Sequence, residues 1–314
     1  MKTTLALLFL SFFSLITSCD TVSSKKNLET SLVIVSDYLT SKDTVIFTAF
    51  AKKEKVRIFI RTKTTDQIIG AFRKSEYGTK YDIIMMSSLF DVHRLSKINC
   101  LHPITELEDE LIETKKFSSS KYNFIGFGID PFVLRHHKDT ISRSKTYSDL
   151  KQEDFNTNLT QEELVPMLSA LMSRLNKVQS YNWVKQFHER KAFIAKPNQK
   201  SPNRPVFLTT YSKGIDTKNK DLFKHYKDIF IPNQRTKGSF YDLKTFAIAK
   251  QAEHFTTAKS FIKHYLKEKQ NLFLTQKLNV YPVCKNKRTI RLYKVSSDNL
   301  IQYYSMIQRI QSKL

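Results

Sequence analysis

Glycine is scarce in this 314-residue chain, which has 6 glycines and 1 tryptophan. Gly126-Phe127-Gly128 is followed by Pro131, so the spacing is not that of a dinucleotide-binding loop. The sequence has no phosphate-binding loop, no Gly-x-Ser-x-Gly turn and no His-Glu-x-x-His motif. Its eight histidines do not fall at zinc-ligand spacing. A hydrolytic enzyme would need a clustered nucleophile and base, so we predict a protein without catalytic residues that is not an enzyme.

Acidic residues are few compared with basic ones. The chain has 29 Asp and Glu against 52 Lys and Arg, which gives a formal net charge of +23. Such a balance is common in nucleic-acid-binding proteins. The lysines are scattered and do not form one basic arm, so we predict no nucleic acid partner. A solvated lysine-rich surface explains most of the charge, and anionic lipid headgroups or an anionic ligand are the other candidates.

Long apolar runs are absent apart from one at the N-terminus. Lys2 precedes an apolar run from Leu5 to Ile16, which is too short to span a membrane and is typical of a signal peptide. The small residues before Cys19 resemble a bacterial lipobox, which predicts signal peptide 1–18, lipidation of Cys19 and a polar tether at 19–30. An ordinary secretory signal is the alternative. The lipoprotein would be exported and anchored to an envelope membrane, on the periplasmic side or the cell surface.

From residue 31 on, strand-like and helix-like patterns alternate. The first part of the chain predicts the order βαβαβα, and hence a parallel sheet with right-handed crossovers. The predicted strands are 31–36, 56–60, 81–86, 101–104, 124–127, 131–136, 192–195, 206–208 and 240–249. The predicted helices are 45–51, 65–72, 89–95, 160–175, 255–266, 272–276 and 299–312.

Three local signals refine this prediction. Thr160 precedes Glu163 at capping-box spacing. Ser297 or Asp298 is expected to cap the last helix. Trp183, the single tryptophan, is expected in the core.

The stretch Ile231–Val283 contains a loop with Pro232 and Gly238, an apolar strand, an amphipathic helix and Tyr281-Pro282-Val283. It resembles the C-terminal part of bacterial extracellular solute-binding proteins, the ferric-ion-binding type above all. VIVS at 33–36, YDII at 81–84, INCLHPI at 98–104 and YSDL at 147–150 resemble further motifs of that family. Asn99-Cys100 departs from the pattern, because the family often has Ala-Gly there.

The resemblance implies an α/β fold of the periplasmic binding protein type II class. Two lobes, each with a central mixed and mostly parallel sheet, would be joined by two crossing hinge strands. The first lobe would comprise residues 31–120 and 240–290, and the second lobe 121–239 and 291–314. In that layout Cys100 and Cys284 both fall in the first lobe or at its hinge edge, which allows a disulfide between them, and two buried free thiols are the alternative.

Ligands of open α/β sheets bind beyond the carboxyl ends of the strands. This rule selects the loops after the predicted strands, and the helix N-termini that follow them favour an anion. The candidate ligand-binding residues are Ser36, Asp37, Tyr38, Thr65, Asp66, Ser87 and Ser88 in the first lobe and Thr210 and Tyr211 in the second. Tyr241 is a further candidate phenolate.

The resemblance also raises the question of a metal. Ferric-binding members hold iron with hard oxygen ligands, notably two consecutive tyrosines. Only Tyr211 matches here, because its neighbour is Thr210, and Asp37 offers a carboxylate instead of the family's histidine. Tyr211 and Asp37 are therefore the candidate metal ligands. Ferric iron as transported ligand, another hard metal, an anion and a small organic solute all stay open, and no resident cofactor is predicted.

The resemblance implies a monomeric, membrane-anchored solute-binding protein that captures a small solute or metal ion in an interlobe cleft. Its partner would be an ABC permease in the inner membrane. The alternative is an exported sensor or scaffold lipoprotein with the same fold and no transport ligand. In that case we expect a cleft filled by the protein's own side chains.

Overall fold

Three parallel strands begin the fold, as the apolar runs predict. In the computed structural model, β1 (Ser31–Ser36) pairs in parallel with β2 (Arg57–Thr62) on one side and β3 (Ile83–Met86) on the other. The connecting helices are α2 (Thr48–Glu54), α3 (Thr65–Lys74) and α4 (Leu89–Lys97). A 3-10 helix, η1 (Ser41–Phe47), directly precedes α2. The predicted βαβαβα order is confirmed.

The structure describes residues 30–74, 80–107, 115–121, 123–139, 145–173, 175, 177–193, 204–216, 220–233, 237–283 and 290–311. The predicted signal peptide, Cys19 with most of the tether, and Cys284 lie outside these residues. Cys100 is a buried free thiol whose Sγ lies 3.2 Å from the Leu95 carbonyl oxygen. Its pairing with Cys284 stays a prediction.

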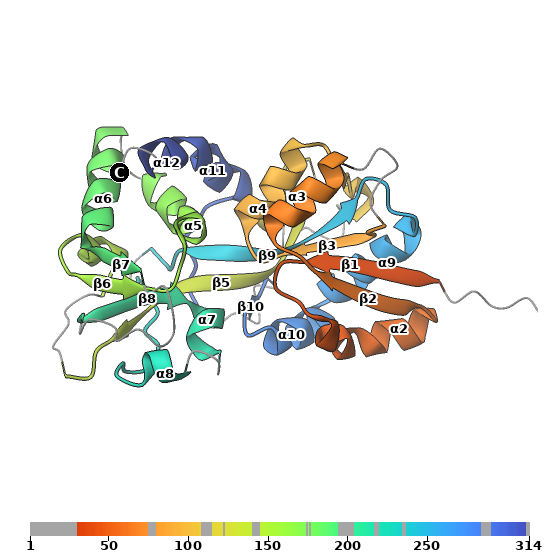
Figure 1. Ribbon diagram of the computed structural model, residues 1–314, viewed down its shortest axis with the longest axis horizontal. Coiled ribbons are helices and arrows are strands. Elements are labelled where there is room, and N and C mark those ends of the chain that lie inside the picture. The colour runs from red at the N-terminus through yellow and green to blue at the C-terminus, as the bar shows by residue number, and fades with distance from the viewer. Residues whose placement is uncertain are drawn as a thin grey trace, which may run out of the picture. The chain divides into compact units, whose positions relative to one another are not determined.

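Two long strands lead from the first sheet into the second (Figure 1). β9 (Tyr241–Ala249) is antiparallel to β3 and to the short β4 (Leu101–His102). β5 (Ile125–His136) pairs with β9 over residues 125–131 and with β8 (Val206–Thr210) over residues 132–136. The sequence predicts two separate pieces of this strand. The structure makes them one, because pairing with β9 continues through Pro131.

The second sheet is built on β8. It pairs in parallel with β6 (Phe155–Thr157), which pairs in parallel with β7 (Lys191–Phe193). The strand order is β2-β1-β3-β9-β5-β8-β6-β7, and β10 (Tyr281–Pro282) is antiparallel to β5. The helices of this part are α5 (Gln161–Met172), α6 (Lys177–Arg190), α7 (Tyr211–Ile215) and α8 (Lys220–Phe223).

The C-terminal helices are α9 (Phe255–Leu266), α10 (Glu268–Lys277), α11 (Ser297–Gln302) and α12 (Tyr304–Gln311). The sequence predicts one last helix capped by Ser297 or Asp298, and this prediction is wrong. Ser296 is the cap, with an extended backbone and an Oγ that accepts the Asn299 N–H at 3.2 Å. Ser297 and Asp298 form other hydrogen bonds: the Ser297 hydroxyl donates to the Lys116 carbonyl, and the Asp298 carboxylate accepts the Ser120 N–H.

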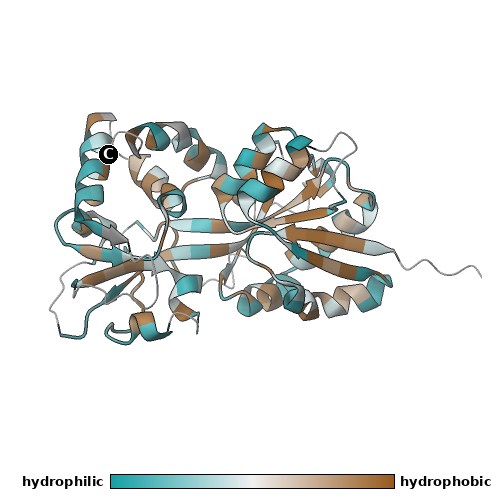
Figure 2. Ribbon diagram, viewed as in Figure 1, coloured by the Kyte–Doolittle hydropathy of each residue, from teal (hydrophilic) through white to brown (hydrophobic). Residues whose placement is uncertain are grey.

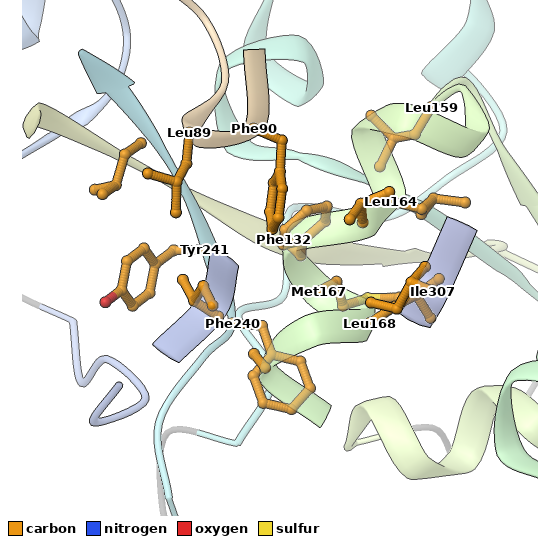
Figure 3. Packing of buried hydrophobic residues seen from close by; sticks show 14 of the residues in the cluster. Leu89, Phe90, Phe132, Leu159, Leu164, Met167, Leu168, Phe240, Tyr241 and Ile307 are labelled. Carbon is orange, nitrogen blue, oxygen red and sulfur yellow. The ribbon is translucent and has the colours of Figure 1, made fainter. Parts of the chain in front are cut away.

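The core fills both faces of the sheets, whose strands are mostly hydrophobic whereas many outward helix positions are hydrophilic (Figure 2). One apolar cluster is continuous from α4 to the second sheet: Phe90 lies beside Phe132, and Ile307 lies beside Leu168 (Figure 3). A second cluster packs α9 on the first sheet through Phe261, as the predicted apolar stripe requires. Trp183 is buried, as predicted.

Contacts make Ser31–Leu314 one compact unit. Among the described residues, no helix combines the length and the apolar character needed to cross a bilayer.

Candidate functional site

A cavity of about 780 Å³ lies where the loops after β1 and β3 face the N-termini of α5 and α7, across the crossing strands β5 and β9. This volume is within the range of small-molecule sites and far exceeds a single ion. Seven of the ten predicted ligand-binding residues line it: Asp37, Tyr38, Thr65, Asp66, Ser87, Ser88 and Thr210. The rule that ligands bind beyond the carboxyl ends of the strands therefore predicted the position of the cavity correctly. That these residues bind a ligand stays a prediction.

Three predicted residues lie elsewhere. Ser36 is fully buried, and its Oγ accepts the backbone N–H of Leu39 at 3.2 Å, so it shapes the turn after β1. Tyr211 does not line the cavity, and its ring centroid lies 4.9 Å from that of Tyr281. Tyr241 is buried in the core and donates its hydroxyl to the Val295 carbonyl at 3.0 Å. This placement corrects the expectation that Tyr241 offers a phenolate, because the alternation of β9 turns it away from the cavity.

Asp37 and Ser87 form a pair at the first-sheet side of the cavity. The Ser87 N–H donates to Asp37 Oδ1 at 2.8 Å, and the Ser87 hydroxyl donates to Asp37 Oδ2 at short range. The pKa of Asp37 is raised, chiefly because burial penalises the carboxylate, although the Ser87 hydrogen bonds act against this effect.

Asp130 and Ser212 repeat this arrangement at the second-sheet side. The Ser212 N–H donates to Asp130 Oδ1 at 2.9 Å, and its hydroxyl donates to Oδ2 at 2.5 Å. Asp130 belongs to β5 and Ser212 to α7, so each side of the cavity carries one aspartate fixed by one serine.

The crossing strands add a buried carboxyl and an amine. Asp242 of β9 lies opposite Asp130 of β5 in the strand register. Its Oδ1 accepts the Leu89 N–H at 2.9 Å, and burial raises the pKa of Asp242 to about 7. Lys244 projects from the same face of β9, with its Nζ 3.4 Å from Asp130 Oδ2 and 3.3 Å from the Ser87 carbonyl oxygen.

The sequence interpretation missed Asp130, Asp242 and Lys244. A signal for the latter two was present in YDLKTFAIA at 241–249, where alternation places both charges on one face of a mostly apolar strand. Asp130 follows a mostly apolar run, and no motif or alternation of charges around it indicates that it faces a cavity.

Two observations concern the predicted metal ligands. Among the described residues, no group of three or more His, Cys, Asp or Glu side chains has a geometry that could hold a metal. Of the two predicted metal ligands, Asp37 lines the cavity and Tyr211 does not. The pKa of Tyr38, a cavity tyrosine, is raised well above its usual value by burial and by the nearby Asp37 and Asp43.

Comparison with known proteins shows the class of the fold. No family model matches the sequence, and no curated protein matches it. Solved structures match it closely in three dimensions: the chain has the fold of ferric-ion-binding-type periplasmic binding proteins. Sequence identities to these structures are 15% or lower, so the likeness concerns the fold alone.

Three of these structures illustrate the match. A Trichodesmium protein (IdiA, FutA) in complex with iron and citrate has 14% identity and a TM-score of 0.76. The ferric binding protein from Campylobacter jejuni has 15% identity and a TM-score of 0.75. The Mannheimia haemolytica ferric iron-binding protein A in an open conformation has 14% identity and a TM-score of 0.73. Each match covers 90% of this chain and 98% of the other.

Proposed function

We propose that this protein is the membrane-anchored solute-binding component of an ABC import system, and that it captures a small solute in the cavity between its two lobes. The observation that carries the proposal is the cavity of about 780 Å³ at the crossing strands. It is lined from both sheets, and strand ends of α/β folds are where ligands bind. The function rests on binding alone and needs no catalytic group.

In this proposal, as in the sequence prediction, one lobe comprises residues 31–120 and 240–290, and the other comprises residues 121–239 and 291–314. β5 and β9 connect them, so bending of these strands would open and close the cavity. Ligand would favour the closed form because it contacts both sides, and the permease would recognise that form.

The cellular setting follows from the sequence. Cys19 would carry the lipid after removal of residues 1–18, and residues 19–30 would tether the folded body to the envelope membrane. The partner is then a permease of the inner membrane, and one protomer suffices for capture. One matched structure is named a periplasmic binding protein, which supports export.

The rival function, a sensor or scaffold with no transport ligand, predicts a cleft filled by the protein's own side chains. A cavity of this volume argues against that outcome. Ferric iron, which the matched proteins are named for, is included as a cargo to be tested, although the donor set here lacks the paired tyrosines.

Ligand-dependent melting tests the proposal. We expect at least one ligand among ferric iron with citrate, inorganic anions and small organic solutes to raise the melting temperature saturably, because binding to the native state stabilises it by mass action. Small-angle scattering should show a smaller radius of gyration with the same ligand.

Two variants locate the binding site. Thr65→Trp places a large ring at a residue that lines the cavity and should abolish the ligand-induced shift. Thr256→Trp, on the exposed first turn of α9 and away from the cavity, should keep it. If no ligand shifts the transition, or if Thr65→Trp keeps the full shift, the proposal is wrong.

A further inference from the structure

The charge of the cavity is opposite to that of the chain. Among the described residues, nine carboxylate side chains line the cavity, against four basic ones. The carboxylates are Asp37, Asp43, Asp66, Asp91, Asp130, Asp216, Asp242, Glu162 and Glu163, and the bases are Arg94, Lys213, Lys244 and Lys277. The whole chain has a formal charge of +23, so this acidic lining is not a by-product of composition.

Two of the helix N-termini that we expected to favour an anion, those of α4 and α7, already contact carboxylates of the protein itself. Asp242 accepts the Leu89 N–H at the start of α4, and Asp37 accepts the Ser87 N–H just before it. Asp130 accepts the Ser212 N–H in the first turn of α7. At these two helix starts an anionic ligand would therefore meet carboxylates beside the N–H groups.

Lys244 shows what chemical group the cavity accepts. Its ammonium group contacts Asp130 at 3.4 Å and the Ser87 carbonyl at 3.3 Å, and it lies 5.3 Å from the centroid of the Tyr38 ring. The charge of Lys244 also acts on Asp37, so one alkylammonium group lies between the two aspartate–serine pairs. The side chains of Lys244 and Asp130 are only 11% and 2% exposed, so the contact is built into the protein.

Aromatic side chains also line the cavity. The hydroxyl of Tyr38 is buried and has no hydrogen-bond partner among the described residues. Phe90 and Tyr304, which also line the cavity, stack with centroids 5.0 Å apart. Aromatic faces beside carboxylates favour organic ammonium groups through cation–π attraction.

We propose that the cargo is an organic cation with at least one primary ammonium group, held by the Asp37–Ser87 and Asp130–Ser212 pairs from opposite sides of the cavity. This inference rests on the proposed solute-binding function and names its substrate class. A cavity of about 780 Å³ accommodates a chain with several amines. The ammonium of the cargo takes the environment that Lys244 occupies in this structure.

Calorimetry on the full-length protein in detergent tests the substrate class. The probes are spermidine and 1,4-diaminobutane, with 1,4-butanediol as the neutral match, succinate as the anionic match, and ferric ion with citrate. We expect saturable binding of an amine and none of the diol or succinate. Binding of ferric citrate or succinate without any amine overturns this inference and leaves the solute-binding function standing. Binding of no probe, with no ligand found by the melting test above, overturns both.

Three variants test the site. Asp37→Asn and Asp130→Asn keep the side-chain shape and should each raise the Kd of the amine by roughly 10- to 100-fold, because each removes one charge-assisted contact. Lys244→Met should lower the Kd, because it removes the competing ammonium. Glu189→Gln, on the exposed face of α6, is the matched control and should leave the Kd unchanged. Unchanged affinity in both aspartate variants, or weaker binding in Lys244→Met, contradicts the proposal.

Discussion

Asp242 lies buried in the middle of β9, and burial raises its pKa to about 7, from an ordinary value of 3.8. In the unfolded chain this carboxyl ionises near its ordinary value, so between about pH 4 and pH 7 the folded protein holds a proton that the unfolded chain has lost. The contribution of Asp242 to the free energy of unfolding therefore falls as pH rises through this window and is constant above it. Asp242→Asn should remove this decline in the free energy of unfolding, which amounts to at most about 4 kcal/mol.

Urea unfolding at a series of pH values from 4 to 8 measures this effect. Asn keeps the Oδ1 acceptor for Leu89, so the variant should match wild type near pH 4 and exceed it at pH 8. Glu189→Gln is the control, because the side chain of Glu189 is 58% exposed on α6, and this variant should show the same decline as wild type. A decline of the same size in Asp242→Asn and wild type would contradict the burial argument.

Single residues also show the limits of what the sequence predicts. Asp37, Ser87 and Thr210 could be named in advance because strand ends converge on one edge of a sheet. Asp130 could not be, because its contact with Lys244 depends on the register of β5 against β9, which pairs residues about 110 positions apart. Tyr241 was predicted at the ligand site and lies in the core instead, for the same reason: which face of a strand points to a cavity depends on the partner strand.

At the scale of elements, two glycines differ in the space around them: Gly126 lies in a tightly packed strand, and Gly70 lies in a helix with free space beside it. A Cβ at Gly126 of β5 would lie 2.8 Å from the backbone oxygen of Phe117, whereas a Cβ at Gly70 of α3 would have no atom within 4 Å. We expect Gly126→Ala to lower the free energy of unfolding by about 1–3 kcal/mol, because the backbone must shift. Gly70→Ala should raise it by about 0.5–1 kcal/mol, because alanine favours helix.

Denaturant unfolding of the two variants beside wild type provides the comparison, and each glycine variant is the control for the other. Equal changes in the two variants, or stabilisation by Gly126→Ala, would show that the contact with Phe117 relaxes at no cost. In that case β5 is more compliant at its bulge near Gly126 than its packing indicates.

Elements with a strong local signal were predicted well. The capping box of α5 is present as expected, with the Thr160 N–H donating to Glu163 at 2.9 Å and the Glu163 N–H donating to Thr160 at 3.2 Å. The turn at Asn99 departs from the family pattern, and its φ of 55° is one that asparagine tolerates well. The end of the chain was predicted less well, since Ser296, Ser297 and Asp298 can all cap a helix and only tertiary contacts decide among them.

For the whole molecule, the chain has 52 basic and 29 acidic residues, yet the cavity is lined mainly by acidic ones. The excess of basic residues therefore lies outside the cavity. Basic surfaces are attracted to anionic headgroups, and this attraction decays within a Debye length of about 8 Å at physiological salt. We therefore expect two separable modes of membrane association: a lipid on Cys19, which salt does not weaken, and a charge contribution, which salt removes.

Cys19→Ala in the full-length chain separates these modes. Membrane fractions of expressing cells should retain wild type at about 1 M salt, where the Debye length is about 3 Å. The variant should be released from the same fractions at that salt concentration and partly retained at low salt. Cys284→Ser, which changes a cysteine distant from the predicted lipobox, should behave as wild type. Retention at high salt of Cys19→Ala chains that have lost residues 1–18, as mass spectrometry determines, would contradict the lipid anchor, and complete release of these chains at low salt would show that the basic surface does not hold the protein at the membrane.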